Sequence, residues 1–329
     1  MPTPSGVIAP YGLLEHAALL YRDERDYLDA AVAFIEGGLN RGESVLVAVP
    51  TINLELLRVA LGRRAPRVEM HDMTVIGGNP GRIIGDLLLD FAARHSEAST
   101  RTLAEPTWFG RDPIEYPACA QHEALINVAC AGLRATIACA YHVAKLDGHM
   151  ISDAARTHPV LWTGAATWPS PHYTDPEVTA ASFNLPFPPV PRAAAEMTIR
   201  PGSTGASRRF TASFGLSVGL PLDRVADAVL VIDELVNNTE MHGGGYGRLA
   251  AWADDRRAIF EVSDGGYIKD SLAGRRRVNQ DEPAGHGLAL AHRQCDLMRT
   301  HTSPAGTTTR VYFELALRRT RPSSLRTMS

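Results

Sequence analysis

Apolar and polar positions in the first half of the chain follow two alternating patterns. Residues 44–49 form a nearly continuous apolar run, which is typical of a strand buried on both faces of a sheet. Residues 27–39 repeat apolar positions at helical spacing, which predicts an amphipathic helix. The same patterns predict further strands and helices at residues 16–21, 54–61, 68–73, 81–95, 101–105, 116–131 and 133–141. Such alternation predicts a three-layer α/β domain with a mainly parallel sheet over residues 1–165.

Prolines crowd the middle of the chain, between residues 168 and 201. Because proline breaks helices and central strands, we predict neither element there. We interpret residues 166–194 as a semi-rigid connector between two domains. Phe183 and Phe187 indicate that this connector packs on a domain instead of hanging free.

Apolar residues recur at helical spacing again between residues 225 and 236, which predicts a helix with one buried face. Glu234 and Asn238 are four residues apart, so a carboxylate and an amide oxygen would project from the same side. Such a pair can orient a hydroxyl group and ligate a hard cation. Glu234 is therefore a candidate base and Asn238 a candidate metal ligand, although an acidic helix face is often simply solvated.

A strand pattern over residues 258–262 ends at Asp264, which two glycines, Gly265 and Gly266, follow. A carboxylate at this point can accept a hydrogen bond from an exocyclic amine such as that of adenine. The glycines allow a flat ligand to approach the backbone. The alternative is an ordinary Asp-Gly-Gly hairpin turn.

A second glycine-rich motif, Gly285-His286-Gly287, precedes an apolar helix pattern that begins at Leu288. Unpaired backbone N–H groups and the positive end of a helix favour an anion, so the motif predicts a phosphate site. A lone GxG is weak, because it usually marks only a turn.

The order of these motifs resembles the GHKL ATPase superfamily, and within it the RsbW and SpoIIAB anti-sigma serine kinases. The resemblance covers about residues 195–317 and implies a two-layer α/β sandwich of the Bergerat type. By this resemblance Glu234 would be the catalytic base and Asn238 the Mg²⁺ ligand. Asp264 and Gly266 would bind adenine. The phosphate loop would contain Gly285, Gly287 and Leu288, and Thr307 would lie close to the nucleotide. Ile268 stands where the family often has another glycine, so the geometry beyond Gly266 departs from that pattern.

Two observations favour the serine-kinase branch of that superfamily. Residues 192–228 contain no histidine, so the dimerising helical hairpin of a sensor histidine kinase is not expected. The chain ends soon after residue 317, with a basic segment over 318–329 that we expect to be a disordered, solvated tail and not a transducer domain.

Composition agrees with a regulator that binds neither nucleic acid nor membrane. The 329 residues are 45% hydrophobic and 21% charged with a formal net charge of −3, which suffices for two cores and offers no general attraction to nucleic acid. No apolar run approaches the length of a membrane span, the four cysteines form no CxxC pair, and no signal peptide is visible. We expect a cytoplasmic protein.

The first half resembles the MEDS sensory domain through residues 16–21, 34–39 and 45–50 and through Arg156-Thr157-His158-Pro159. This resemblance implies a sensing role and agrees with a RecA-like fold. No GxxxxGK[ST] motif occurs, and Pro50-Thr51 follows the most apolar strand instead, so we expect a small-molecule pocket there and no nucleotide hydrolysis.

A possible metal pair also lies in this half. Cys119 and His122 are three residues apart on a predicted helix, next to Glu123, and could share a metal ion. A buried cysteine beside a helix-surface histidine is the favoured interpretation, and we assign no ligand there.

The sequence thus predicts an ATP- and Mg²⁺-dependent anti-sigma factor that works as a homodimer. Its partners by resemblance are a sigma factor, which it sequesters, and a STAS-domain anti-anti-sigma protein, which it phosphorylates on serine. The alternative is a catalytically silent ATP-binding module that switches partners without phosphoryl transfer.

Overall fold

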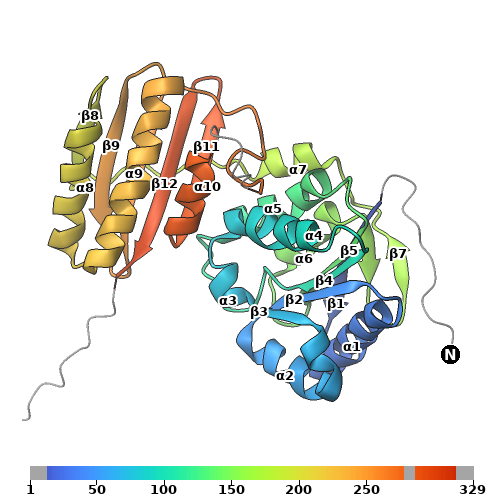
Figure 1. Ribbon diagram of the computed structural model, residues 1–329. Coiled ribbons are helices and arrows are strands. Elements are labelled where there is room, and N and C mark those ends of the chain that lie inside the picture. The colour runs from blue at the N-terminus through green and yellow to red at the C-terminus, as the bar shows by residue number, and fades with distance from the viewer. Residues whose placement is uncertain (1–12, 278–285, 316–329) are drawn as a thin grey trace, which may run out of the picture.

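The computed structural model describes residues 13–277 and 286–315. Gly285 and the expected basic tail lie outside the described residues. The described chain forms two α/β bodies that lie side by side, with the N-terminal one coloured blue to green and the C-terminal one yellow to red in Figure 1. No helix in the described ranges is long and apolar enough to cross a membrane.

The N-terminal body is built on a seven-stranded sheet in the order β3-β2-β4-β5-β1-β6-β7. Its strands are β1 (Leu14–Tyr21), β2 (Ser44–Val49), β3 (Glu69–Asp72), β4 (Thr100–Ala104), β5 (Ala135–His142), β6 (Val160–Trp162) and β7 (Thr167–Pro169). The strands pair in parallel, except that β7 runs antiparallel to β6 at the edge. The predicted mainly parallel sheet is confirmed.

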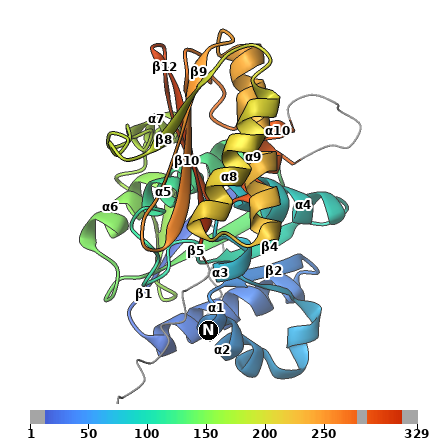
Figure 2. The ribbon, with the colours of Figure 1, turned by 90° about the vertical axis from the view of Figure 1, so that its left-hand side faces the viewer.

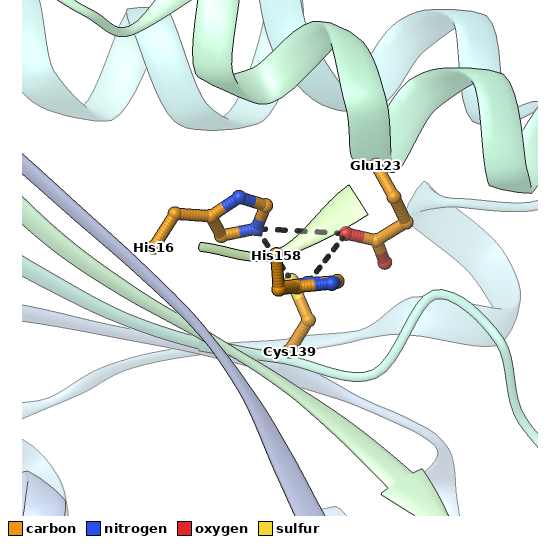
Figure 3. A group of neighbouring side chains, drawn as sticks. All are labelled: His16, Glu123, Cys139 and His158. Atoms are coloured by element: carbon orange, nitrogen blue, oxygen red, sulfur yellow. Dashed lines mark hydrogen bonds and ion pairs between the residues drawn. The ribbon is translucent and has the colours of Figure 1, made fainter. Parts of the chain in front are cut away.

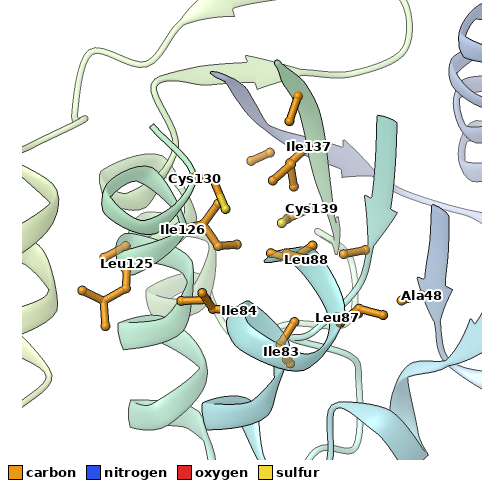
Figure 4. Packing of buried hydrophobic residues seen from close by; sticks show 14 of the residues in the cluster. Ala48, Ile83, Ile84, Leu87, Leu88, Leu125, Ile126, Cys130, Ile137 and Cys139 are labelled. Carbon is orange, nitrogen blue, oxygen red and sulfur yellow. The ribbon is translucent and has the colours of Figure 1, made fainter. Parts of the chain in front are cut away.

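Helical segments cover both faces of this sheet. They are α1 (Glu24–Asn40), α2 (Thr51–Leu61), η1 (Gly62–Arg67), α3 (Met73–Ile76), η2 (Pro80–Arg82), η3 (Ile83–Leu89), α4 (Asp90–Arg94), α5 (Tyr116–Ala129), α6 (Gly148–Thr157) and α7 (Pro176–Ser182). Along β2, Val45 and Val47 belong to the core beneath α1 and α2, whereas Leu46 and Ala48 belong to the opposite core beneath η3 and α5 (Figure 4). This alternation gives the three layers that the sequence predicted.

Two predictions about local structure are wrong in detail. The helical pattern at residues 81–95 is not one helix, because it divides into the 3-10 turn η2, the π-helix η3 and the short helix α4. The proline-rich segment contains the helix α7, which was not expected, whereas its strand β7 lies at the sheet edge and agrees with the exclusion of a central strand. Pro176 is tolerated because it occupies the first turn, where its missing N–H costs nothing. The Asp175 side chain caps the helix by accepting from the N–H groups of Glu177 and Val178.

The connector does pack on its neighbours, as its aromatic residues indicated. The guanidinium of Arg310 lies 4.6 Å from the centre of the Phe187 ring, and that of Arg299 lies 5.2 Å from it. Phe183 lies near Arg156 of α6 in the N-terminal body. The connector therefore touches both bodies.

The C-terminal body is a five-stranded antiparallel sheet in the order β11-β12-β10-β9-β8, with helices on one face (Figures 1 and 2). Its elements are β8 (Ala195–Ile199), α8 (Thr204–Val218), α9 (Leu222–His242), β9 (Gly247–Ala253), β10 (Arg257–Asp264), α10 (Gly287–Gln294), β11 (Leu297–Ser303) and β12 (Gly306–Glu314). Phe260 is fully buried between this sheet and the helices, edge-to-face with Phe214 and Phe313. The predicted two-layer sandwich is confirmed.

The other face of that sheet packs partly on the N-terminal body. Ile259, Leu297 and Tyr312 form a buried apolar cluster with Ala118 of α5. Polar contacts surround the cluster: Arg257 is paired with Asp112. Asn79 Nδ2 donates to the backbone oxygen of His292 at 2.9 Å, and Arg293 Nη2 lies 2.5 Å from Asp86 Oδ1. The two bodies thus share a packed interface.

Glu105 occupies a buried position at the carboxyl end of β4. Its carboxylate accepts from the Tyr21 hydroxyl at 2.8 Å and from Asn53 Nδ2 at 2.6 Å. Burial outweighs these two bonds and raises the pKa of Glu105 from 4.5 to about 7. The protonated side chain therefore suits the folded state better than the carboxylate does.

We predict that Glu105 makes stability fall as pH rises. Because its pKa is higher in the folded chain, its contribution is complete below pH 4.5 and is lost as pH rises through about 7. The loss should be on the order of 3 kcal/mol between pH 5 and 8. Urea unfolding of wild type and Glu105→Gln at both pH values measures it as a difference between the two proteins. Equal pH dependence in wild type and Glu105→Gln would contradict the prediction.

Candidate functional site

Asp264 ends β10, and its carboxylate is fixed by two donors from different segments. Oδ2 accepts from the Thr239 hydroxyl of α9 at 2.7 Å, and Oδ1 accepts from the Gly266 N–H at 2.8 Å. The backbone of Gly243 passes so close that an added Cβ would lie 2.6 Å from Asp264 Cγ. The carboxylate is thus held in one orientation at a point where only glycine fits beside it.

Thr307 holds the turn after Asp264 from the neighbouring strand. The two residues face each other in the antiparallel register of β10 and β12. The Thr307 hydroxyl donates to the Gly266 backbone oxygen at 2.8 Å and lies 2.7 Å from the Thr302 hydroxyl. The structure therefore brings together Asp264, Gly266 and Thr307, which the sequence had assigned to the same site.

Glu234 lies against the start of α10. A Cβ added to Gly287 would lie 2.5 Å from Glu234 Oε2, so the glycine lets the helix begin close to the carboxylate without displacing that side chain. The neighbouring acidic residue, Asp233, is engaged elsewhere: Arg208 of α8 forms a two-point contact with it at 2.6 and 2.9 Å. Asn238 follows one turn after Glu234 on α9, and both side chains are only partly buried. The acidic and amide groups thus remain accessible.

The first turn of α10 leaves its backbone N–H groups without a side-chain cap in the described structure. Leu288, in this turn, is partly buried against the core of the C-terminal body. Uncapped N–H groups beside a glycine form the arrangement that binds anions such as phosphate. Gly285, which the sequence placed in the same loop, lies outside the described residues.

Two residues of this site were missed in the sequence. Thr239 directly follows Asn238, and Thr302 lies on β11 opposite Thr307. The sequence could have pointed to Thr239, because it follows the predicted ligand Asn238 on the helix that also carries Glu234. Thr302 could not, since only the pairing of β11 with β12 brings it to Gly266 through Thr307.

Residues 267–277, called here the bridging segment, run from the site to the N-terminal body. The Ile268 N–H donates to the Thr302 hydroxyl at 2.9 Å, so the departure from the family pattern at this position is accommodated by β11. Leu272 is buried in the N-terminal core, and Arg275 Nη2 donates to Gln121 Oε1 of α5 at 2.7 Å. A cleft of about 180 Å³ opens between the bridging segment, α7 and β11. It does not include Glu234, Asn238 or Asp264.

The residues weighed as a metal pair in α5 lie outside the group of potential metal-ligating side chains found in the described part of the chain. Cys119 and His122 are both buried, so the expected helix-surface histidine is wrong and the buried cysteine is confirmed. Burial lowers the pKa of His122 to about 3 and raises the pKa of the Cys119 thiol to about 12, which favours the neutral form of each. Glu123 contacts other residues, His16 and His158.

Comparison with known proteins supports both halves of this description. Residues 15–159 match the MEDS family, described as "MEthanogen/methylotroph, DcmR Sensory domain". Residues 197–313 match the family of histidine kinase-like ATPase domains. No curated protein matches the sequence.

Several solved structures match parts of the chain. One is the crystal structure of the RsbU and RsbW domains of a Mycobacterium tuberculosis protein, 21% identical, with a TM-score of 0.30, covering 38% of this chain and 33% of that one. The match thus spans about a third of that protein's length. The two family matches together show a MEDS domain in the N-terminal half of the chain and a histidine kinase-like ATPase domain in the C-terminal half.

Proposed function

We propose that this protein is an ATP-dependent anti-sigma factor and protein serine kinase whose activity the MEDS domain modulates. The observation that carries the proposal is the contact between the Glu234 carboxylate and Gly287 at the uncapped start of α10. A carboxylate beside an uncapped helix start supports phosphoryl transfer, and Asp264 lies fixed at the end of β10.

Each site residue then has a role in binding ATP. Asp264 accepts a hydrogen bond from the adenine amine. Gly266 and Thr307 fix the turn that follows Asp264, next to the adenine ring. The N–H groups at Gly285, Gly287 and Leu288 bind the phosphates. The close approach at Gly287 leaves space for phosphate, and the side-chain oxygens of Glu234 and Asn238 on α9 suit a magnesium ion bound to a nucleotide. Asn238 would hold Mg²⁺, which supplies charge neutralisation at the phosphates.

Glu234 acts on the incoming serine of a STAS-domain protein. Its carboxylate orients the serine hydroxyl and takes the proton as the hydroxyl oxygen bonds to the γ-phosphorus, and ADP leaves. Serine and not histidine is the proposed acceptor, because residues 192–228 lack a histidine. A sigma factor is the second partner, held while the STAS protein is phosphorylated. Partners of this class would place the protein in the cytoplasm.

The competing function is a silent ATP-binding module that switches partners without phosphoryl transfer. Both functions require Asp264 and the phosphate-binding helix start, so nucleotide binding alone does not separate them. The accessible Glu234 beside Gly287 favours the kinase, because a silent module has no use for a carboxylate next to the phosphates.

The first test separates the roles of three site residues. Glu234→Gln should retain ATP affinity within about threefold and lose phosphoryl transfer by about a hundredfold or more. Asn238→Ala should lose the Mg²⁺ dependence of ATP binding. Asp264→Asn should weaken ATP binding about tenfold to a hundredfold, since it loses a charge-assisted bond. Calorimetry with ATP and transfer of radiolabelled phosphate to STAS proteins are the measurements.

Asp233→Asn is the matched control, because this neighbouring carboxylate is occupied by Arg208. Wild-type protein that binds ATP and a sigma factor but labels no STAS protein would favour the silent module. Unchanged ATP affinity in a folded Asp264→Asn variant would remove adenine recognition from this residue.

Modulation by the MEDS domain would act through the bridging segment. The Arg275 guanidinium is buried between the domains, and burial lowers its pKa to about 10. Arg275 donates a hydrogen bond to Gln121. The preceding residue, Gly274, packs closely on Leu288 of α10. A shift of α5 would therefore move a segment that touches the start of the phosphate-binding helix.

We predict that releasing this contact weakens ATP binding. Gln121→Ala should lower ATP affinity about three- to tenfold, because a freed bridging segment must be ordered again on binding, at a cost on the order of 1 kcal/mol. Arg277→Ala is the control, since its exposed pairing with Asp90 should matter little. Equal ATP affinity in wild type and Gln121→Ala, measured by calorimetry, would rule out coupling through Arg275.

We also propose that the ATPase domain forms the homodimer. Leu216 and Leu222, near the turn between α8 and α9, are exposed apolar residues on the helical layer, as is Leu230 of α9. Such residues suit a protein interface more than solvent.

A fragment of residues 192–317 should be dimeric in light scattering, and Leu222→Glu should shift it to monomer. Leu13→Glu, exposed on the other domain, is the control in the full chain. A monomeric fragment together with a dimeric full chain would place the interface on the MEDS domain.

A further inference from the structure

Four metal-ligating side chains from four segments meet inside the MEDS domain (Figure 3). His16 comes from β1, Cys139 from β5, Glu123 from α5, and His158 follows α6. All four are buried. They lie apart from the nucleotide site, and the role proposed for the ATPase domain makes no use of them.

The distances between the nitrogen, oxygen and sulfur atoms of these side chains match those between ligands of one metal ion. Glu123 Oε2 lies 3.3 Å from His158 Nε2 and 3.6 Å from His16 Nε2. Cys139 Sγ lies 3.5 Å from His16 Nε2, and all four ligand atoms fall within 4.8 Å of one another. Two ligands of one tetrahedral zinc ion stand about 3.4 Å apart for nitrogen and oxygen and about 3.6 Å apart for nitrogen and sulfur, given the usual bond lengths.

Hydrogen bonds behind the cluster fix how the histidines point. Asn127 Nδ2 donates to the backbone oxygen of Thr157 at 2.8 Å, so its Oδ1 is the acceptor that faces His16 Nδ1 at 3.1 Å. The His158 Nδ1 lies 2.9 Å from the backbone oxygen of Ala154. Both rings therefore carry their proton on Nδ1 and direct the Nε2 lone pair inward, which is the arrangement of metal-ligating histidines.

The cluster has more acceptors than donors. Both carboxylate oxygens of Glu123 and the Nε2 atom of His158 are buried without a hydrogen-bond partner in the described structure. Buried polar atoms without partners are costly. With Glu123 ionised and both imidazoles neutral, the four side chains offer only the Cys139 thiol as a donor toward one another, and the Tyr141 hydroxyl is a further donor beside Glu123. A cation at the centre would satisfy all of them at once.

We propose that His16, Glu123, Cys139 and His158 bind one divalent transition-metal ion of the zinc type. The two imidazoles are neutral, and a Cys139 thiolate with the Glu123 carboxylate balances the charge of the ion. Binding releases the thiol proton, as at other thiolate sites. Burial lowers the pKa of the His16 ring to about 4, which favours its neutral form, and raises the pKa of the Cys139 thiol, so the ion must displace the thiol proton.

The alternative occupant of the cluster is a proton. A protonated histidine paired with Glu123 would form a metal-free ion pair, which the same distances allow. Cys139 separates the two, because a thiolate ligand gives a Co²⁺ complex an intense near-ultraviolet charge-transfer band that an ion pair lacks. The site is independent of the proposed kinase function, so each can fail alone.

The test uses the full chain, freed of metal by a chelator and titrated with Co²⁺. Wild type should bind about one Co²⁺ per chain with the thiolate band, and Zn²⁺ should displace it. Cys139→Ser should abolish the band, and His158→Gln should reduce Co²⁺ affinity about a hundredfold or more. Asn127→Ala should weaken binding about 10- to 100-fold through the lost orientation of His16.

Cys119→Ser and His122→Gln are matched controls, because both residues are buried in the same helix as Glu123 but lie outside the cluster. They should bind Co²⁺ as wild type does. If Cys139→Ser does not fold, X-ray absorption of the Zn²⁺-loaded wild type should still show one sulfur among nitrogen and oxygen ligands. Wild type without a thiolate band, a zinc shell without sulfur, or a band lost only with Cys119 would each overturn the proposal.

Discussion

Burial of β10 on both faces is the constraint on which the rest of the structure depends. An antiparallel sheet commonly keeps one face in solvent, but successive residues of β10 here enter two different cores. Phe260 packs under the helices, while Ile259 packs toward Ala118 of the MEDS domain. A shift of one residue in register would exchange these two environments, so the strand is held in place from both sides.

That fixed register also determines the chemistry at the end of the strand. The pairing that buries Phe260 opposite Val311 places Asp264 opposite Thr307. Thr239 then reaches the same carboxylate from α9. The core and the domain interface, and not a loop, therefore fix the geometry of the proposed nucleotide site.

The sequence predicted those parts of the molecule whose signal is local. The buried strand at residues 44–49 and the helix pair of Glu234 and Asn238 follow from periodicity alone, and the structure has both elements. The division of residues 81–95 did not follow from periodicity, and this stretch lies against a segment distant in the sequence. A side chain at Gly85 would collide with the backbone of the bridging segment, 2.9 Å from the Arg275 carbonyl oxygen.

The buried cluster shows the same limit more clearly. Glu123 was weighed with Cys119 and His122, since they share helical spacing, yet its contacts are with His16 and His158. No spacing rule joins residues that lie more than 30 positions apart. The parallel pairing of β1 with β5 and β6 brings the segments that carry the two histidines together, and α5 packs Glu123 against them.

Helix α5 links this cluster to the ATPase domain by geometry alone. Gln121 and Glu123 are two residues apart, so they point about 200° apart around the helix. One side chain accepts from Arg275 of the bridging segment, and the other faces the two histidines. A packed helix moves as a unit because its core does not deform continuously. Any occupant that repositions Glu123 must therefore also act on the contact at Gln121, and through it on the segment that packs against α10.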